Sequence, residues 1–148
     1  MPDNIDTEGI QKTITEMAKV YGIDPKLALD VATAESNLNP KAIGKAGEVG
    51  LFQIHPKYLN YITKIVTGKT YSKKDLMDPT LNAKVGVGYL SILKGQLREK
   101  YSPALLIQTY NQGYGYTKKH NYQISSDMLK HPNNIYRAYF TGENENAQ

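Results

Sequence analysis

The side chain best placed for chemistry in this 148-residue sequence is the carboxylate of Glu35. It follows the largely apolar run LALDVATA at residues 27–34 and stands at the end of the helix which that run predicts. The negative end of a helix dipole and apolar surroundings both disfavour an ionised carboxylate, so we expect the pKa of Glu35 to be raised. A carboxylic acid that stays protonated near neutral pH can serve as a general acid toward a glycosidic oxygen. Position alone, however, favours a surface Glu that points into water.

Four short segments, the first of which contains Glu35, together resemble the lytic transglycosylase (SLT) family. They are Glu35-Ser36, GLFQI at residues 50–54, Asp78-Pro79 followed by Asn82, Gly86, Tyr89 and Leu90, and YNQG at residues 110–113. Each segment alone is weakly specific, but four segments in the family's order at suitable spacing are strong evidence of a resemblance. The resemblance extends from about Pro25 to Tyr136. It implies a mainly α, lysozyme-like (goose-type/SLT-like) fold. The implied activity is that of a peptidoglycan lytic transglycosylase.

The resemblance also implies roles for individual side chains. Glu35 matches the sole catalytic acid/base, and the expected substrate-binding residues around it are Ser36, Gln53, Tyr110, Asn111 and Tyr136. Each of these five also has a structural alternative, such as completing the backbone hydrogen bonds of a loop, packing in the core or ending a helix. We interpret Asn82, Gly86, Tyr89 and Leu90 as structural, because glycine and apolar positions at helical spacing build a packing interface.

Two places depart from the family pattern. Glu48 stands where many members carry a small residue, and we interpret it as a solvated loop charge. The alternative is a second carboxylate in the cleft, which would favour attack by water and hydrolysis. Near Tyr136, where the family often has a Glu a few residues earlier, this sequence reads HPNN at residues 131–134. The surroundings of Tyr136 are therefore expected to differ from the family's.

A single carboxylate is enough for the implied reaction, because substrate-assisted glycosidases dispense with the second one. By the resemblance, Glu35 protonates the oxygen that leaves N-acetylmuramic acid, and the acetamido group of the substrate stabilises the charge at the anomeric carbon. The ionised Glu35 then accepts a proton from the C6 hydroxyl, and a 1,6-anhydro ring closes. One alternative is a lysozyme-like muramidase, a hydrolase on the same fold. Another is a catalytically weak wall-binding or virion structural module.

The elements that must position these residues are predicted to be helices, in one domain over residues 1–140 with a polar, frayed tail at 141–148. The predicted helices cover residues 7–21 with Thr7 as cap and Gly22 as stop, 25–36 after Asp24, 56–67 before Gly68, 79–100 after Asp78, 104–110 after the cap Ser102, and 134–140. Residues 42–53 are rich in glycine and are expected to form a loop or small hairpin. Gly86 and Gly88 each cost the long helix about 1 kcal/mol relative to Ala, which we expect the close approach of a neighbouring backbone to offset.

Composition excludes several classes of protein. Without cysteine there is no disulfide scaffold, Cys-ligated zinc or thiol catalysis, and the spacing of the three histidines fits no metal motif, so we expect no metal and no cofactor. The 18 Lys and Arg against 14 Asp and Glu give a net charge of +4, which mildly favours an anionic partner such as teichoic acid or another wall polymer. The basic residues are scattered rather than arranged in a stripe, so nucleic acid is not expected.

The place of action expected from the resemblance is the bacterial cell wall or periplasm, with peptidoglycan glycan strands as the partner and a monomer as the working form. No apolar run is long enough to span a bilayer. The N-terminal segment lacks the basic and apolar regions of a signal peptide. We therefore expect a chain that is associated with a virion, released through a holin, or separated from its leader. Among these the sequence favours a phage enzyme over a subunit of a secretion machine.

Overall fold

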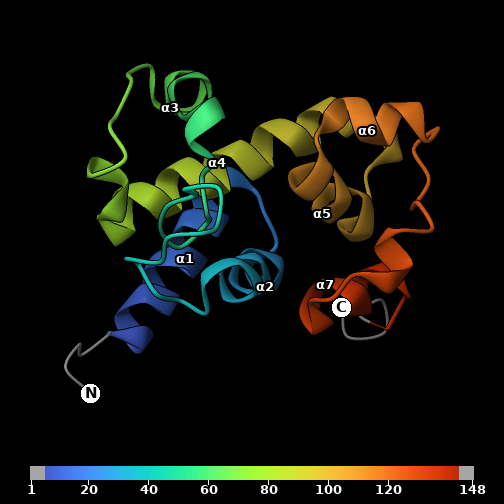
Figure 1. The fold of residues 1–148 in the computed structure, drawn as a ribbon, viewed down its shortest axis with the longest axis horizontal. Coiled ribbons are helices and arrows are strands. Elements are labelled where there is room, and N and C mark those ends of the chain that lie inside the picture. The colour runs from blue at the N-terminus through green and yellow to red at the C-terminus, as the bar shows by residue number, and fades with distance from the viewer. Residues whose placement is uncertain (1–5, 144–148) are drawn as a thin grey trace. The chain divides into compact units, whose positions relative to one another are not determined.

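The computed structural model describes residues 6–143, and their secondary structure is helical (Figure 1). The helices and short 3₁₀ turns are α1 (Thr7–Tyr21), α2 (Pro25–Ser36), η1 (Pro56–Tyr58), α3 (Leu59–Thr67), η2 (Asp75–Met77), α4 (Pro79–Leu97), η3 (Arg98–Lys100), α5 (Pro103–Gln112), α6 (Tyr114–Lys119), η4 (Met128–Lys130) and α7 (Asn134–Phe140). Within the described residues, β pairing is limited to the isolated bridges Ile43–Val49 and Val49–Ile54. The predicted mainly α class is confirmed.

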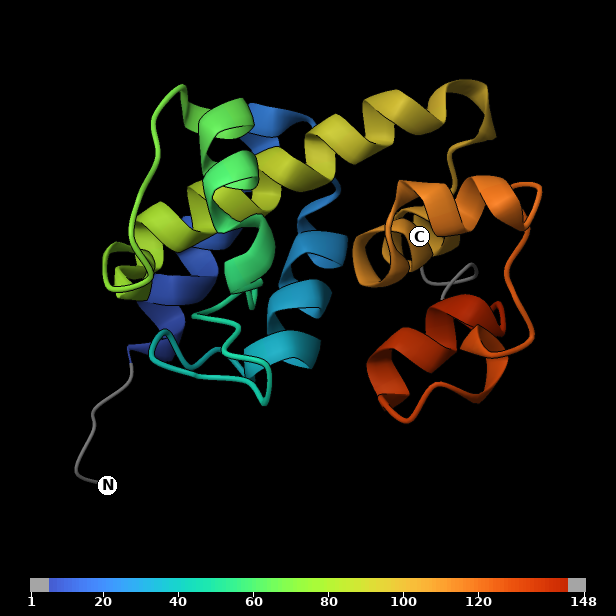
Figure 2. The same cartoon turned by 45° about the horizontal axis from the view of Figure 1, so that its top comes forward.

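The chain divides into two compact units within α4, an N-terminal unit that ends at Tyr89 and a C-terminal unit that begins at Leu90. Figure 2 shows α4 as one continuous helix that contributes to both units. The predicted single domain over residues 1–140 stays a prediction. Of the predicted tail, residues 141–143 form a turn and residues 144–148 lie outside the described part of the chain.

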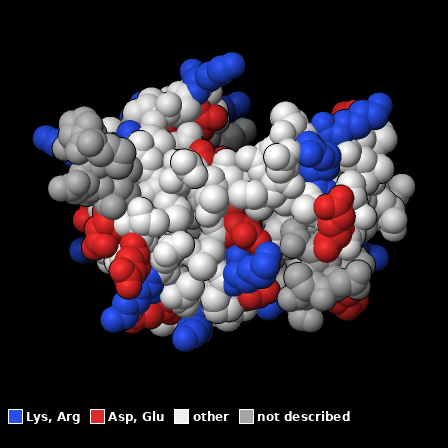
Figure 3. All heavy atoms as spheres, turned by 90° about the horizontal axis from the view of Figure 1, so that it is seen from below, with Lys and Arg blue, Asp and Glu red and all other residues white. Residues whose placement is uncertain are grey.

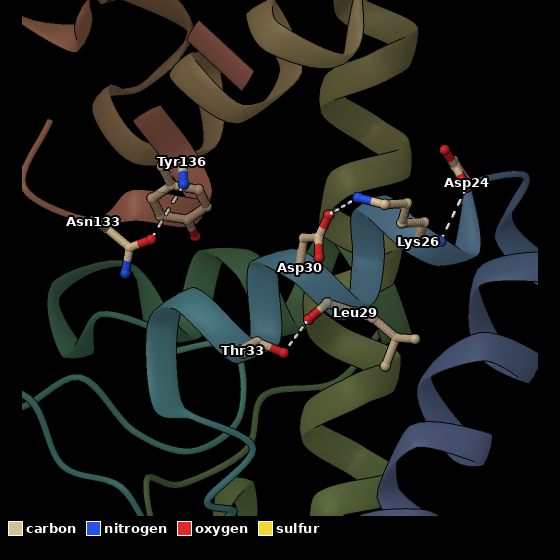
Figure 4. Close-up of polar contacts among 7 residues, drawn as sticks. All are labelled: Asp24, Lys26, Leu29, Asp30, Thr33, Asn133 and Tyr136. Atoms are coloured by element: carbon tan, nitrogen blue, oxygen red, sulfur yellow. Dashed lines mark hydrogen bonds and ion pairs between the residues drawn. The ribbon is translucent and has the colours of Figure 1, made fainter. Parts of the chain in front are cut away.

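The first two helices begin and end at residues suited to those positions. The cap of α1 is Asp6 rather than the expected Thr7: its carboxylate accepts a hydrogen bond from the Gly9 N–H at 2.9 Å, and a charged acceptor is favoured at the positive end of the helix dipole. Gly22 ends α1 in the left-handed region with φ 72°. Asp24 caps α2 by accepting from the Lys26 N–H at 3.0 Å, as predicted (Figure 4).

Apolar faces of α1 and α2 form part of the core of the N-terminal unit, where these two helices pack against each other. The fully buried side chains that they contribute include Ile14, Ala18, Leu27, Ala28, Val31 and Ala32. On the outer side of α2, Lys26 and Asp30 form an ion pair at 2.8 Å, and the Thr33 hydroxyl donates to the Leu29 carbonyl at 2.8 Å (Figure 4). Helix α2 is therefore buried along the side that carries Leu27, Ala28, Val31, Ala32 and Ser36 and exposed at Lys26.

Two of the three glycines of α4, Gly86 and Gly88, give room to side chains and not to a neighbouring backbone, which corrects the prediction from the sequence. A methyl group on Gly86 would overlap the Phe52 ring, and one on Gly88 would stand 2.5 Å from Val66 Cγ1. Phe52 is completely buried. The loss of helix propensity at these positions is thus offset by aromatic and aliphatic packing.

Asn82, also on α4, holds the glycine-rich loop in place. Its amide oxygen accepts from the Phe52 N–H at 2.9 Å, and its amide nitrogen donates to the carbonyls of Val49 at 3.0 Å and Leu76 at 2.9 Å. Because the side chain is completely buried, these bonds satisfy backbone groups that water cannot reach. The structural interpretation of Asn82 is confirmed, although its contribution is polar and not the apolar packing that we expected.

The C-terminal unit contains one helix that the sequence analysis missed. Ser102 caps α5 as predicted, by accepting from the Leu105 N–H at 3.1 Å. The two glycines after residues 104–110 predict that the chain leaves the helix there. Gly113 does end α5, with φ 98°, but it also caps the start of α6, and Gly115 lies inside α6. Buried hydrogen bonds hold α6 against α5, since Gln108 Nε2 and the Thr109 hydroxyl both lie within 3.2 Å of the Thr117 hydroxyl.

The surface carries both signs of charge. On the face shown in Figure 3, Lys and Arg side chains alternate with Asp and Glu among uncharged residues, without a basic stripe. Among residues 6–143, no helix combines the length and the apolar character that crossing a bilayer requires.

Candidate active site

Glu35 lies in the last turn of α2 and is half-buried. Asn37 ends the helix in the left-handed region, with φ 54°. The last turn contains no basic residue, so no side chain of that turn neutralises the negative end of the helix dipole beside the Glu35 carboxyl. The expectation that Glu35 is held in its neutral form stays a prediction.

Ser36 joins the end of α2 to the GLFQI segment. Its buried hydroxyl lies 2.8 Å from the Leu51 carbonyl and 2.9 Å from the Ala32 carbonyl, one turn back in its own helix. Since a hydroxyl has one proton to donate, it is shared between these two acceptors. Ser36 thereby fixes the turn that carries Glu35 against residues 50–54.

Gln53 stands in the same loop and adopts an uncommon backbone conformation, with φ 50°. Its amide nitrogen donates to the carbonyls of Ala42 at 3.1 Å and Gly50 at 3.0 Å, which ties the two ends of the glycine-rich loop together. These two bonds orient the amide and leave its oxygen Oε1 as an acceptor that faces Gly44. The side chain is half-buried, so Oε1 is accessible from solvent.

Glu48 folds back onto its own loop. Its Oε1 accepts from the Ala46 N–H at 2.9 Å, and the side chain is half-buried. It therefore does not extend fully into solvent as a loop charge would. The same oxygen lies close to Gly44, next to the amide oxygen of Gln53.

In the C-terminal unit, Tyr110 and Asn111 occupy the last turns of α5, and both are half-buried. The amide nitrogen of Asn111 donates to the Ile107 carbonyl of the preceding turn at 3.0 Å. This bond fixes the amide, so that its oxygen is the acceptor that a ligand could use.

Tyr136 is almost completely buried in the first turn of α7, with 2% of its surface exposed. Its backbone N–H donates to the Asn133 cap at 3.2 Å (Figure 4), and the His131 ring meets its ring edge-on at 5.4 Å. The HPNN segment that departs from the family pattern is thus a helix cap with an aromatic contact. Helices α5 and α7 pack against each other within this unit.

The predicted site residues therefore form two groups. Glu35, Ser36 and Gln53 belong to the N-terminal unit, where the Ser36–Leu51 contact joins α2 to the loop that carries Gln53. Tyr110, Asn111 and Tyr136 belong to the C-terminal unit, on two helices in contact. No group of three or more His, Asp or Glu side chains in the described chain converges as metal ligands do.

Sequence reasoning missed two features of the N-terminal group. The first is the Asn82 clamp, whose signal is a polar residue inside an otherwise apolar helix face. The second is Gly44, which leaves room for the Glu48 and Gln53 oxygens; nothing in the local sequence pattern indicates that those two side chains meet there.

Comparison with known proteins finds a matching family model, relatives of similar sequence and solved structures of similar fold. Residues 12–131 match the family model of the transglycosylase SLT domain. Relatives named membrane-bound lytic murein transglycosylase C are 36% identical over 109 residues in Haemophilus influenzae and 31% identical over 140 residues in Mannheimia succiniciproducens, which are 69% and 86% of this chain. The matched part is only 30% and 39% of the length of those relatives.

Solved structures give the same fold. The lytic transglycosylase Slt of Pseudomonas aeruginosa, an inactive E503Q mutant, matches with a TM-score of 0.70 and 20% identity over 92% of this chain and 24% of its own. The 70 kDa soluble lytic transglycosylase of Escherichia coli matches with a TM-score of 0.66 and 23% identity over 86% of this chain and 24% of its own. The expected lysozyme-like fold is confirmed.

Proposed function

Because this chain belongs to the family of transglycosylase SLT domains, we propose that it is a peptidoglycan lytic transglycosylase with Glu35 as its acid and base. The substrate is the β-1,4 bond between N-acetylmuramic acid and N-acetylglucosamine, and the product carries a 1,6-anhydromuramic end. The observation that carries this proposal is the hydrogen bond from the Ser36 hydroxyl to the Leu51 carbonyl. It holds the end of α2, which bears Glu35, against the loop that bears Gln53.

The proposed reaction needs one side chain that exchanges a proton twice. Neutral Glu35 donates its proton to the glycosidic oxygen as the bond to the anomeric carbon breaks, and the acetamido oxygen of the substrate stabilises the cation. The Glu35 carboxylate then takes the proton of the C6 hydroxyl while O6 bonds to the anomeric carbon. The proton count returns to its starting value, and no water is consumed.

The other proposed site residues act on the glycan or on Glu35. Gln53 has a fixed amide with a free acceptor oxygen, which suits contact with an amide or hydroxyl of the glycan. Asn111 offers a fixed amide oxygen in the same way, and Tyr110 and Tyr136 supply phenol groups. Ser36 is a positioning residue in this proposal, since backbone carbonyls occupy its hydroxyl.

Substitution of Glu35 tests the proposal. Glu35→Gln keeps the size of the side chain and removes the transferable proton, so we expect the release of muropeptides from purified sacculi to fall at least about 100-fold, the usual share of general acid–base catalysis. Mass spectrometry of the released muropeptides measures both the rate of cleavage and the chemical form of the new glycan ends. Glu16→Gln, an exposed glutamate on α1, is the matched control and should keep full activity. Equal activity of Glu35→Gln and the unchanged protein would refute the assignment.

The same products separate a transglycosylase from a muramidase. Anhydro ends differ from reducing ends by one water, and a hydrolase would require a second group to activate that water. Glu48 is the carboxylate that the sequence offered for this role, and its bond to the Ala46 N–H supports a role in the loop instead. We therefore expect anhydro products from both the unchanged protein and Glu48→Ala.

The bacterial cell wall is the proposed place of action, with a peptidoglycan glycan strand bound by a monomer. Delivery by a virion, release through a holin and export as part of a secretion machine all remain compatible with this activity. A phage origin stays a prediction from the sequence.

A further inference from the structure

Two side-chain oxygens lie over Gly44 in the glycine-rich loop. A methyl group on Gly44 would stand 2.5 Å from Glu48 Oε1 and 2.6 Å from Gln53 Oε1, so both oxygens border the same methyl-sized space. The backbone of Gly44 does not need glycine for its φ angle, since it is absent from the positive-φ residues. A methyl group there would instead require these two acceptor oxygens to move.

The two oxygens lack a shared donor within the protein. Gln53 Oε1 receives no hydrogen bond in the described chain, and the two hydrogen bonds of that side chain are both donated by its amide nitrogen. Glu48 receives one, from the Ala46 N–H, and forms no ion pair with any described residue. The ammonium nitrogen of Lys73 lies close to Gly47, the residue before Glu48, but it forms no ion pair with the Glu48 carboxylate.

Two neighbouring acceptors, one of them charged, select a particular kind of donor. A hydroxyl or a secondary amide N–H can donate to one of them only, whereas a primary ammonium has three donors and no acceptor. Its positive charge also strengthens the hydrogen bonds and compensates Glu48. A neutral donor would leave the carboxylate uncompensated.

We propose that Glu48 is a specificity-determining residue, which together with Gln53 binds a primary ammonium group of the substrate next to the cleavage site. This inference rests on the proposed function, in which Gln53 contacts the glycan. Peptidoglycan offers such a group from two sources: the diamino acid of a stem peptide that is not cross-linked, and an amino sugar that has lost its acetyl group.

A comparison of the cleavage rates on two forms of one substrate tests the proposal. We compare untreated sacculi with sacculi whose amines have been acetylated by acetic anhydride, and follow the release of muropeptides. We expect the unchanged protein to act about 3- to 10-fold faster on untreated sacculi, the range expected for a half-buried charged hydrogen bond. Glu48→Ala and Glu48→Gln should act equally on both. Glu48→Gln keeps an acceptor for the Ala46 N–H, so it separates the charge from the folding of the loop.

Two further variants sharpen the result. Gly44→Ala should also abolish the preference, because its methyl group displaces both oxygens. Glu16→Ala removes the same charge from an exposed position on α1 and should keep the preference. Removal of the stem peptides by an amidase abolishes the preference if the stem supplies the ammonium and leaves it unchanged if a deacetylated amino sugar does.

The outcomes distinguish this inference from the function on which it rests. If the unchanged protein and Glu48→Ala show the same ratio of rates on the two kinds of sacculi, the ammonium site is wrong and the transglycosylase assignment stands. If the unchanged protein releases nothing from either kind, the proposed function itself is wrong.

Discussion

At the scale of single residues, three side chains of the glycine-rich loop and its neighbour α2 are held by backbone groups rather than by other charged groups. Ser36 is shared between two carbonyls, Gln53 donates to two carbonyls, and Glu48 accepts from a backbone N–H. Neutral partners of this kind fix a side chain without pairing its charge, which leaves the acceptor oxygens of Gln53 and Glu48 available to a ligand.

His131 gives a prediction at this scale. Burial lowers the pKa of His131 below its ordinary value of 6.5, and the nearby charge of Arg137 lowers it further. Its Nδ1 accepts from the Asn133 N–H at 3.0 Å, a bond that only the unprotonated nitrogen can accept. The folded state therefore favours the neutral ring, so this contribution to stability is complete above about pH 6.5 and is lost as the pH falls through 6.5 toward the folded pKa.

We expect His131→Gln to make the free energy of unfolding less sensitive to pH between 7.5 and 5.5 by about 0.5 kcal/mol, a small value because solvent screens the partly exposed ring. Urea titrations at the two pH values measure the difference. Lys130→Gln, at the exposed neighbouring position, is the control and should keep the original pH dependence. An unchanged pH dependence in His131→Gln would show that the ring titrates alike in the folded and unfolded states.

At the scale of the elements, two glycines of the same helix should respond oppositely to alanine. Gly95 is exposed, and a methyl group there would meet nothing within 4 Å, so Gly95→Ala should stabilise the protein by about 0.5–1 kcal/mol through helix propensity. A methyl group on Gly86 would enter the space of the Phe52 ring, so Gly86→Ala should destabilise it by about 1–3 kcal/mol through overpacking. Urea midpoints of the two variants measure both effects, and the same sign for both would contradict the packing assigned to Gly86.

Helix ends could be predicted from the sequence where one or two neighbouring residues determine them. Asp24-Pro25 and Ser102-Pro103 start α2 and α5 as expected, and Gly22 and Gly68 end α1 and α3 in the left-handed region. Helix α6 was missed because its position depends on distant partners. Two glycines within three residues disfavour a helix locally, but burial of Thr117 and its hydrogen bonds to α5 outweigh that preference.

For the candidate site too, part could be predicted from the sequence and part could not. Its residue types could be found from short motifs, whereas the loop geometry is set by Asn82, which bonds to Phe52 across 30 positions of sequence. The meeting of Glu48 and Gln53 over Gly44 is a consequence of that geometry, so no local pattern could reveal it. The raised pKa expected for Glu35 stays a prediction.

At the scale of the whole molecule, the net charge of +4 should contribute to binding of the cell wall without determining what is cleaved. Charges of both signs share the surface seen in Figure 3, and so the attraction to an anionic polymer is expected to be diffuse and strongly screened by salt. In the proposed function, the glycan is recognised through hydrogen bonds to acceptors such as the amide oxygen of Gln53, and salt affects these bonds much less. The two contributions can therefore be separated by ionic strength.

We expect the Glu35→Gln protein, which should bind without cutting, to lose part of its binding to Gram-positive sacculi when salt rises from low to high concentration. Removal of teichoic acids with hydrofluoric acid should abolish this salt-sensitive part and leave the remainder, because the stripped glycan no longer presents the phosphate groups that attract the basic surface. Co-sedimentation with the two kinds of sacculi measures both parts. If salt sensitivity survives the removal of teichoic acid, the positive charge must act on the peptidoglycan itself, and carboxylates of the stem peptides would then be its target.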